Sequence, residues 1–379
     1  MSRCNVLMLL VWTRVVLCSD VTNGTELVMS FLVHRHGDRT PLESTISFST
    51  DPETLEELSS QYGYGQLTIA GKKRSYELGK FIRRRYYELL SPKYNRSEIY
   101  IRSTDVTRSK MTILTALAAI YPPIGERWHT EIAWEPVPYT TVPVKYDFNT
   151  AMVNCPKFMT AYYALYTSSA PEVTARFSGV LNILTSELGI NITNLPALVY
   201  PIYDVFVSQL SLGLELGPKL DAILDDIGDA ADECIGLTFG VNEYIHLQAG
   251  VLLEEFYTYA ELAMSGEDTP KLRIYSAHDF NVYSLEAVTK VNRQGVPKYA
   301  AAYALELRKI TSTGDYVVLP VYLPSPGEDV VYLQVEGCDL LCEYDRFVEL
   351  TEGNALDISL WRDECGFSED LEVDEASIG

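Results

Sequence analysis

Residue types that could bind and attack an anion follow one apolar run near the start of the chain. Residues Leu27–Val33 are apolar except for Ser30, and the sequence RHGDRTP (35–41) comes soon after them. A short apolar run that ends in turn residues predicts a buried strand, and open α/β sheets bind ligands at the carboxyl ends of such strands. Arg35 and Arg39 would attract an anion, and His36 between them could attack it. The alternative is a surface loop with ordinary charges that caps a helix.

A second pair of candidate residues follows another predicted strand. The run Leu272–Ser276 is followed by Ala277, His278 and Asp279. A His-Asp pair alone is uninformative, but parallel strands bring their carboxyl ends to one edge of a sheet, beside the loop 35–41. There, His278 could donate a hydrogen bond to a phosphate group, and a protonated Asp279 could protonate a leaving group.

Another arginine lies near the end of the strand predicted at residues 98–103. Arg102 lies where this strand runs into a loop, and the alternative role for it is an ion pair with Asp105. Three guanidinium groups can neutralise a phosphate dianion, so we expect neither a metal ion nor a cofactor.

These segments resemble the histidine acid phosphatases. The first loop matches their RHGxRxP motif, and residues 63–79 (GYGQLTIAGKKRSYELG) and 101–112 (IRSTDVTRSKMT) are similar to further segments of that family. The resemblance covers about residues 26–365. It implies that His36 forms a phosphohistidine intermediate, with its other ring nitrogen held by the carbonyl of Gly37, and that Asp279 is the proton donor. The phosphate-binding residues that it implies are Arg35, Arg39, Arg102 and His278.

The residues after the His-Asp pair depart from the family. Phe280 and Asn281 stand where we expect hydroxyl residues in its acid phosphatases, which leaves the contacts to the leaving group open. The chain also lacks the His-Ala-Glu sequence of the branch that includes many inositol polyphosphate phosphatases.

The N-terminus and the charge indicate a secreted protein. Residues 1–19 have a basic start, an apolar centre and small residues before the expected cleavage point, as in a signal peptide. Glycosylation motifs at Asn23, Asn95 and Asn191 agree with secretion. The net charge of −22 opposes nucleic-acid binding, and no later apolar run is long enough to span a membrane. We expect a secreted protein or one of the lysosomal lumen.

The cysteines after the expected signal peptide are odd in number, so at least one is unpaired or pairs between chains. A zinc site at Cys338 and Cys342 would need further ligands, and no histidine follows His278. The family resemblance implies two disulfide bonds, Cys155–Cys365 and Cys338–Cys342. It also implies that the family's third bridge is absent, because Asp204 and Tyr303 stand at the matching positions. Cys234 would then be a buried thiol.

The elements predict an α/β domain interrupted by a helical segment. Residues 146–269 lack strand patterns and predict helices at 158–188, 197–213, 216–235 and 242–264, which would form a cap. The α/β domain then comprises residues 20–145 and 270–365, with helices at 69–90, 106–120 and 282–290, further strands at 301–309 and 315–323, and a short apolar stretch at 330–335. Residues 366–379 form an acidic tail that we expect to be disordered. The resemblance implies a doubly wound mixed sheet flanked by helices, as in phosphoglycerate mutase-like folds, with an inserted α-helical cap.

The leading functional prediction is a secreted or lysosomal-type acid phosphatase that hydrolyses phosphate monoesters. The alternatives are a catalytically weak secreted phosphate-binding protein, such as a venom or salivary component, and a phosphotransferase or mutase with the same phosphohistidine, which the leader disfavours. The expected cap holds only three basic residues, Lys157, Arg176 and Lys219. This charge deficit predicts aryl or singly phosphorylated substrates, including phosphotyrosyl peptides, over inositol hexakisphosphate. Relatives in the family are often homodimers, so the resemblance also implies a homodimer.

Overall fold

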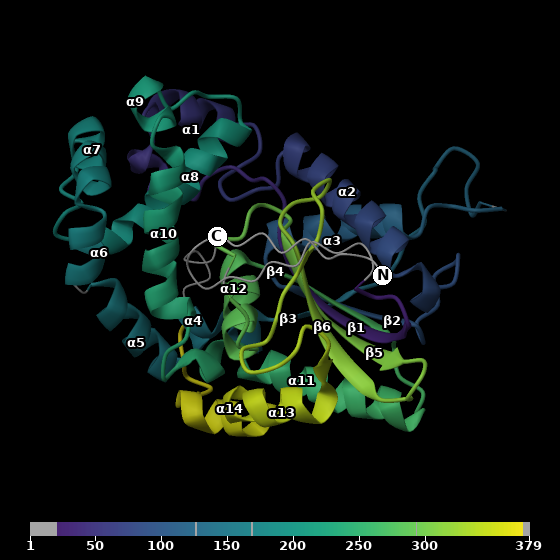
Figure 1. The fold of residues 1–379 in the computed structure, drawn as a ribbon. Coiled ribbons are helices and arrows are strands. Elements are labelled where there is room, and N and C mark those ends of the chain that lie inside the picture. Colours follow the sequence, from purple (N-terminus) through teal and green to yellow (C-terminus); the bar gives the residue numbers. More distant parts are fainter. Residues whose placement is uncertain (1–20, 126, 168–169, 293, 374–379) are drawn as a thin grey trace, which may run out of the picture.

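A mixed sheet of eight strands, with helices on both faces, organises the protein (Figure 1). The computed structural model describes residues 21–125, 127–167, 170–292 and 294–373. The expected signal peptide and the last six residues of the expected tail lie outside the described residues. The predicted doubly wound mixed sheet is confirmed.

The carboxyl ends of three central strands lie side by side. The strand order is β3-β2-β4-β1-β5-β6-β7, and β1 (Thr25–Arg35), β2 (Ile99–Thr104), β3 (Thr140–Val142) and β4 (Leu272–Ala277) are parallel. Arg35 pairs with Ala277, and Ser276 pairs with Ser103, so β1, β4 and β2 end at one level. The antiparallel strands complete the sheet: β5 (Ala302–Ile310), β6 (Tyr316–Leu323), β7 (Val331–Tyr332) and β8 (Cys342–Glu343).

Alternating side chains of the strands build an apolar cluster on each face of the sheet. Leu32 and Ile101 pack with α2 (Ile69–Arg85) and α3 (Thr107–Ile120) on one face. Phe31 and Val33 pack on the other face, which four helices cover (Figure 1). These are α11 (Ile245–Ser265), α12 (Asp279–Val288), α13 (Tyr344–Thr351) and α14 (Ile358–Cys365). The crossover helices therefore anchor the strands whose ends carry the candidate residues.

A third apolar cluster forms the core of a helical cap beside the sheet. It is built mainly from α6 (Pro171–Arg176), α7 (Ser178–Leu188), α8 (Val199–Ser211) and α10 (Leu224–Phe239), and the short α9 (Pro218–Asp221) lies among them. The predicted helix 158–188 is divided into α5 (Pro156–Tyr166), α6 and α7. Pro171 begins α6 because proline lacks the N–H that would continue a preceding helix.

The predicted cap was too long at its C-terminal end. The helix predicted at 242–264 forms as α11, but its residues Leu247, Leu252 and Phe256 belong to the same apolar cluster as Phe31 of the sheet. Its amphipathic pattern predicted a buried face without saying which layer covers that face. The residues of the cap's own cluster lie between Val173 and Cys234.

The polar stretch after the first loop contains two elements that the sequence pattern did not predict. They are the 3-10 helix η1 (Glu43–Phe48) and α1 (Pro52–Ser60), which lie against the cap (Figure 1). Ser49 after η1 donates a hydrogen bond to Gln209 of α8, 2.7 Å away. The remaining short elements are η2 (Tyr87–Leu89), η3 (Val144–Tyr146), η4 (Phe148–Thr150), α4 (Ala151–Asn154), η5 (Pro196–Leu198) and η6 (Glu352–Asn354).

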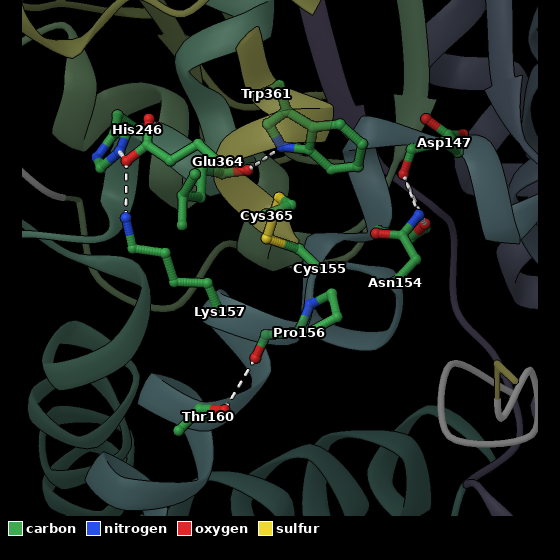
Figure 2. The surroundings of a disulfide bond; sticks show 12 residues. Asp147, Asn154, Cys155, Pro156, Lys157, Thr160, His246, Trp361, Glu364 and Cys365 are labelled. Atoms are coloured by element: carbon green, nitrogen blue, oxygen red, sulfur yellow. Dashed lines mark hydrogen bonds and ion pairs between the residues drawn. A yellow bond between two sulfur atoms is a disulfide. The ribbon is translucent and has the colours of Figure 1, made fainter. Parts of the chain in front are cut away.

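Both disulfide bonds implied by the resemblance are present, Cys155–Cys365 and Cys338–Cys342. Figure 2 shows the first, which joins the start of α5 to the end of α14. Beside it, Glu364 accepts hydrogen bonds from Lys157 and His246, each at 2.8 Å, so His246 has a structural partner. Cys234 is a buried free thiol, as predicted.

The first part of the expected tail is ordered against η3, which corrects the predicted disorder for residues 366–373. Tyr146 donates a hydrogen bond to the Glu369 carboxylate at 2.8 Å, and the Tyr146 ring contacts Phe367. Composition alone gave no signal of these contacts. Among the described residues, no helix has the length and apolarity that crossing a membrane requires.

The contact between α2 and α3 depends on one glycine. A Cβ atom on Gly79 of α2 would lie 2.1 Å from the carbonyl oxygen of Ala116 in α3. We predict that Gly79→Ala forces the two helices apart and lowers the free energy of unfolding in urea by about 1–3 kcal/mol. Gly179→Ala is the matched control, because a Cβ there meets nothing within 4 Å and should stabilise α7 by up to about 1 kcal/mol. Equal effects of the two substitutions would contradict the proposed close contact.

Candidate active site

His36 lies directly after β1 and is almost completely buried. Its Nδ1 is 2.9 Å from the carbonyl oxygen of Gly37. Since a carbonyl oxygen only accepts hydrogen bonds, Nδ1 carries the proton and donates it, and Nε2 keeps its lone pair. This is the arrangement that the family resemblance implied, and it leaves Nε2 as a nucleophile.

Two helices hold the backbone of the loop that carries His36. The N–H of Gly37 donates to Thr112 of α3 at 3.0 Å. A Cβ on Gly37 would lie 2.6 Å from the carbonyl oxygen of Gly71, and a Cβ on Gly71 would lie 2.1 Å from that of Asp38. Glycine is therefore required at both positions, because the loop rests directly on the backbone of the first turn of α2.

Two arginines of the loop have guanidinium groups with buried, unused donors. Arg35 donates to the carbonyl of Pro297 at 2.7 Å, and its guanidinium lies 4.5 Å from the centre of the Tyr299 ring. Arg39 donates to the carbonyl of Thr40 at 3.0 Å. Both also contact a carboxylate of α8, Asp204. The Nε atoms of Arg35 and Arg39 are buried and have no hydrogen-bond partner among the described residues.

The third guanidinium of the site belongs to Arg108, which corrects the prediction of Arg102. Arg102 points into an ion pair with Asp147, 2.7 Å away, and its guanidinium lies 4.3 Å from the centre of the Phe148 ring. It lies two residues before the end of β2 and is not among the residues that line the cavity. Arg108 in the first turn of α3 lines the cavity with His36.

His278 has both ring nitrogens engaged with protein groups. Arg108 donates to its Nδ1 at 3.2 Å, so Nδ1 accepts and Nε2 must carry the proton in the neutral ring. Nε2 then donates to the hydroxyl oxygen of Thr104, 3.1 Å away. In this geometry His278 orients Arg108, whereas the sequence predicted a hydrogen bond from His278 to the phosphate.

Asp279 begins α12 and lies among the same groups. Its Oδ2 is 2.9 Å from a terminal nitrogen of Arg35, and its Oδ1 accepts from the N–H of Phe280 at 2.9 Å. The helix begins at Asp279, three residues earlier than predicted, because Asn281 accepts a hydrogen bond from the N–H of His278 and so holds the first turn. Asn281 also donates to the carbonyl of Asn149 at 2.8 Å, so its side chain serves the fold.

Phe280, which stands where we expect a hydroxyl residue in the family's acid phosphatases, makes aromatic contacts. Its ring stacks on the His278 ring at 5.0 Å between centres, and the Phe239 ring of α10 stacks on Phe280 at 5.4 Å. Residues of the cap and of the α/β domain thus build one aromatic wall. No hydroxyl group at position 280 is available to the leaving group.

Burial and positive charge keep the imidazoles of the site neutral. The pKa of His36 is held well below its ordinary value of 6.5, first by burial and then by the charges of Arg108, Arg35 and Arg39. Burial and the same charges also lower the pKa of His278. Burial and the charge of Arg39 lower the pKa of Arg108 to about 9. The cluster therefore holds a surplus of positive charge that favours an anionic ligand.

A cavity of about 140 Å³ opens above these groups. Its charged part consists of His36, Arg39, Arg108, Asp204, His278 and Asp279. Its other part is mostly apolar or aromatic and consists of Leu42, Thr45, Met152, Tyr162, Tyr200, Pro201, Phe239 and Phe280. The arrangement can hold an anion at one end and a ring or apolar group at the other.

Comparisons with known proteins agree with this geometry. The sequence pattern of the Histidine phosphatase superfamily (branch 2) matches residues 26–189. Prostatic acid phosphatase of Homo sapiens is 32% identical over 338 residues, which cover 86% of this chain and 84% of the relative. The chain belongs to the histidine phosphatase superfamily. Lysosomal acid phosphatase of Homo sapiens is 30% identical over 375 residues, which cover 96% of this chain and 86% of the relative.

Solved structures share the histidine phosphatase fold. The phytase of Citrobacter braakii has a TM-score of 0.65 at 15% identity, covering 90% of this chain and 99% of the phytase. The Hafnia alvei phytase in complex with myo-inositol hexakis sulphate has a TM-score of 0.62 at 15% identity, covering 89% and 99%. At these identities the likeness concerns the fold alone.

Because Arg108 lines the cavity and Arg102 does not, a matched pair of variants can test which arginine serves the site. We expect Arg108→Met to lower kcat/KM on an aryl phosphate by about 10²–10³-fold, the usual effect of losing one charge-stabilising donor. Arg102→Met should leave kcat/KM within about tenfold, but it strands the buried Asp147 and should cost about 3–5 kcal/mol of stability. Thermal unfolding and initial rates of both proteins test this. The opposite ranking of the two rates would return Arg102 to the phosphate site.

Proposed function

We propose that this member of the superfamily is an acid phosphatase that hydrolyses phosphate monoesters through a phosphohistidine at His36. One observation carries the proposal: a buried imidazole whose Nδ1–H is fixed by the Gly37 carbonyl lies among three buried guanidinium groups, and it lines a cavity with two of them, those of Arg39 and Arg108. Such a group has one free nitrogen lone pair and an environment that binds phosphate. The acid phosphatase relatives support the assignment.

The reaction follows from the positions of these groups. Nε2 of His36 attacks phosphorus, the bond from phosphorus to the ester oxygen breaks, and Asp279 in its protonated form gives its proton to that oxygen. Water then attacks phosphorus, Asp279 takes a proton from this water, and the bond to Nε2 breaks to release phosphate. Arg35, Arg39 and Arg108 stabilise the charge on the phosphoryl oxygens in both steps.

The same surroundings explain how an imidazole can attack at acid pH. An ordinary histidine is mostly protonated below pH ~6 and has no lone pair to use. The lowered pKa of His36 keeps its Nε2 unprotonated there. Among the described residues, no group of three or more His, Cys, Asp or Glu side chains could hold a metal ion. We assign the neutralisation of substrate charge to the three arginines.

We propose that the protein acts outside the cytosol, as a secreted or lysosomal glycoprotein. The two disulfide bonds and the exposed positions of Asn23, Asn95 and Asn191 support this setting. The prostatic and lysosomal relatives support it as well. The homodimer and the venom or salivary setting stay predictions.

A trapping experiment on His36 tests the proposed function. During turnover of an aryl phosphate labelled in its phosphate group, we expect acid-labile, base-stable label on His36. His36→Ala should lose label and at least about 10⁴ of kcat, as removal of a nucleophile does elsewhere. His129→Ala is the matched control, because His129 is exposed and does not line the cavity.

Activity of His36→Ala within tenfold of wild type would remove His36 from the mechanism. A wild-type protein that binds phosphate but turns over no aryl phosphate would favour the alternative, a secreted phosphate-binding protein.

The cavity lining supports a preference for aryl or singly phosphorylated substrates, phosphotyrosyl peptides included. The three basic residues of the expected cap are each paired with a carboxylate: Lys157 with Glu364, Arg176 with Glu233, and Lys219 with Glu187. None of the three lines the cavity, whose apolar part offers aromatic rings to a leaving group. Among the described residues that line the cavity, a polyanion would find no cations beyond those that hold the reacting phosphate.

We therefore expect kcat/KM at pH 5 to be at least about tenfold higher on phosphotyrosine than on inositol hexakisphosphate. Thr45→Lys puts a cation on the cavity wall and should raise kcat/KM on the hexakisphosphate more than on phosphotyrosine. Ser60→Lys, an exposed position on α1 outside the cavity, is the control for net charge. A wild-type enzyme that prefers the hexakisphosphate would overturn this assignment.

A further inference from the structure

The mechanism leaves one buried carboxylate of the cavity without a role. Asp204 of α8 lies between the two arginines of the first loop, with Oδ1 2.9 Å from Arg35 and Oδ2 2.7 Å from Arg39. It also lines the cavity and is only 9% exposed. A carboxylate that bridges two guanidinium groups makes the same forked contacts that a phosphate group would make.

Asp204 is charged in this position. Although burial acts to raise it, the charges of Arg39 and Arg35 lower the pKa of Asp204 below its ordinary value. The two arginines thus already have an anion from the protein itself. The donors that Arg35 and Arg39 still offer to a ligand include their two buried Nε–H groups, which have no hydrogen-bond partner among the described residues.

The helix that carries Asp204 holds it firmly against the loop. Three side chains spaced four and three residues apart on α8 contact residues of the loop, and therefore lie on one face of the helix. Besides Asp204, Ser208 donates to the carbonyl of Arg39 at 2.8 Å, and Ser211 donates to the carboxylate of Asp38 at 3.0 Å. A phosphate group that binds Arg35 and Arg39 therefore meets a carboxylate that α8 keeps in place.

We propose that Asp204 is an internal counter-anion of the phosphate site, which weakens the affinity for phosphate and thereby speeds release of the product. Its charge neutralises part of the guanidinium cluster when the site is empty and repels a phosphate dianion when the site is filled. Asp204 acts through Arg35 and Arg39 and is a positioning and affinity-setting residue. The inference rests on the proposed phosphatase function.

The sign of the effect on phosphate affinity separates this role from a structural one. Asp204→Asn keeps the shape of the side chain and removes its charge, so we expect about tenfold tighter binding of inorganic phosphate, by calorimetry and as a competitive inhibitor. KM for an aryl phosphate should fall in parallel, and kcat should fall where phosphate release limits turnover. If Asp204 only held the arginines in place, the same variant would bind phosphate more weakly.

Two further variants complete the test. Asp225→Asn removes an exposed charge from α10 of the cap and should change none of these values. Asp204→Ser removes the charge with a smaller side chain and should also tighten phosphate binding, which the rise of Tm with phosphate concentration measures independently. Weaker or unchanged phosphate binding in the Asp204 variants, or failure of both to fold, would overturn the proposal.

Failure of this inference is distinguishable from failure of the proposed function. A wild-type protein that neither turns over aryl phosphate nor binds inorganic phosphate contradicts the function itself. An active wild-type enzyme whose phosphate affinity does not rise in Asp204→Asn contradicts only the role of Asp204.

Discussion

Repulsion among buried cations governs the design of this site. Arg35, Arg39 and Arg108 lie around one imidazole and are almost completely buried. Burial first, and then the charge of Arg39, lowers the pKa of Arg108, which shows that holding a third cation here is costly. The two carboxylates in the cavity, Asp204 and Asp279, offset part of this charge and leave a surplus that fits a phosphate dianion. The aligned ends of β1, β4 and β2, and the close contact of Gly37 with Gly71 of α2, then hold these groups together despite their mutual repulsion.

The division between sheet and cap separates two tasks. In the proposed mechanism, the sheet domain supplies the groups that hold and attack phosphorus, whereas the cap supplies Phe239 and Tyr200 to the part of the cavity where a leaving group would lie. Phe280 joins the two parts, because its ring stacks on His278 on one side and on Phe239 on the other. Changes in the cap can therefore alter the preferred leaving group while the chemistry at phosphorus stays the same.

Local signals predicted the central strands and the residues at their ends, because a strand, its turn and the residues that follow are adjacent in sequence. These local signals could not show that Arg102 lies outside the site. The alternation of a strand predicts which face of the sheet a side chain lies on, but it does not say which arginine reaches the site. Arg102 and Arg108 lie six positions apart in the same segment that resembles the family. Asp204 could not be predicted as a member of the site, since its contact with Arg35 joins residues 169 positions apart, and α8 has no motif. The placement of α11 failed for a related reason, because amphipathicity reports a buried face and not its partner.

The lowered histidine pKa values that would allow catalysis at acid pH also make the native state sensitive to acid. Burial lowers the pKa of His34 to about 4, and burial with neighbouring cations lowers those of His36 and His278. In the unfolded chain these histidines have a pKa of about 6.5, so they bind protons as pH falls below that value, whereas the native imidazoles stay neutral. The free energy of unfolding therefore falls with pH. His34 alone contributes a loss of about 3 kcal/mol by pH 4. Glu286 acts in the opposite direction, because burial raises its pKa and the native state binds its proton before the unfolded chain does. Its contribution to the free energy of unfolding therefore grows as pH falls toward 4.5. An enzyme that works in acid with a neutral nucleophile therefore needs stability from elsewhere, and the disulfide that ties α5 to α14 supplies a constraint that no proton can remove.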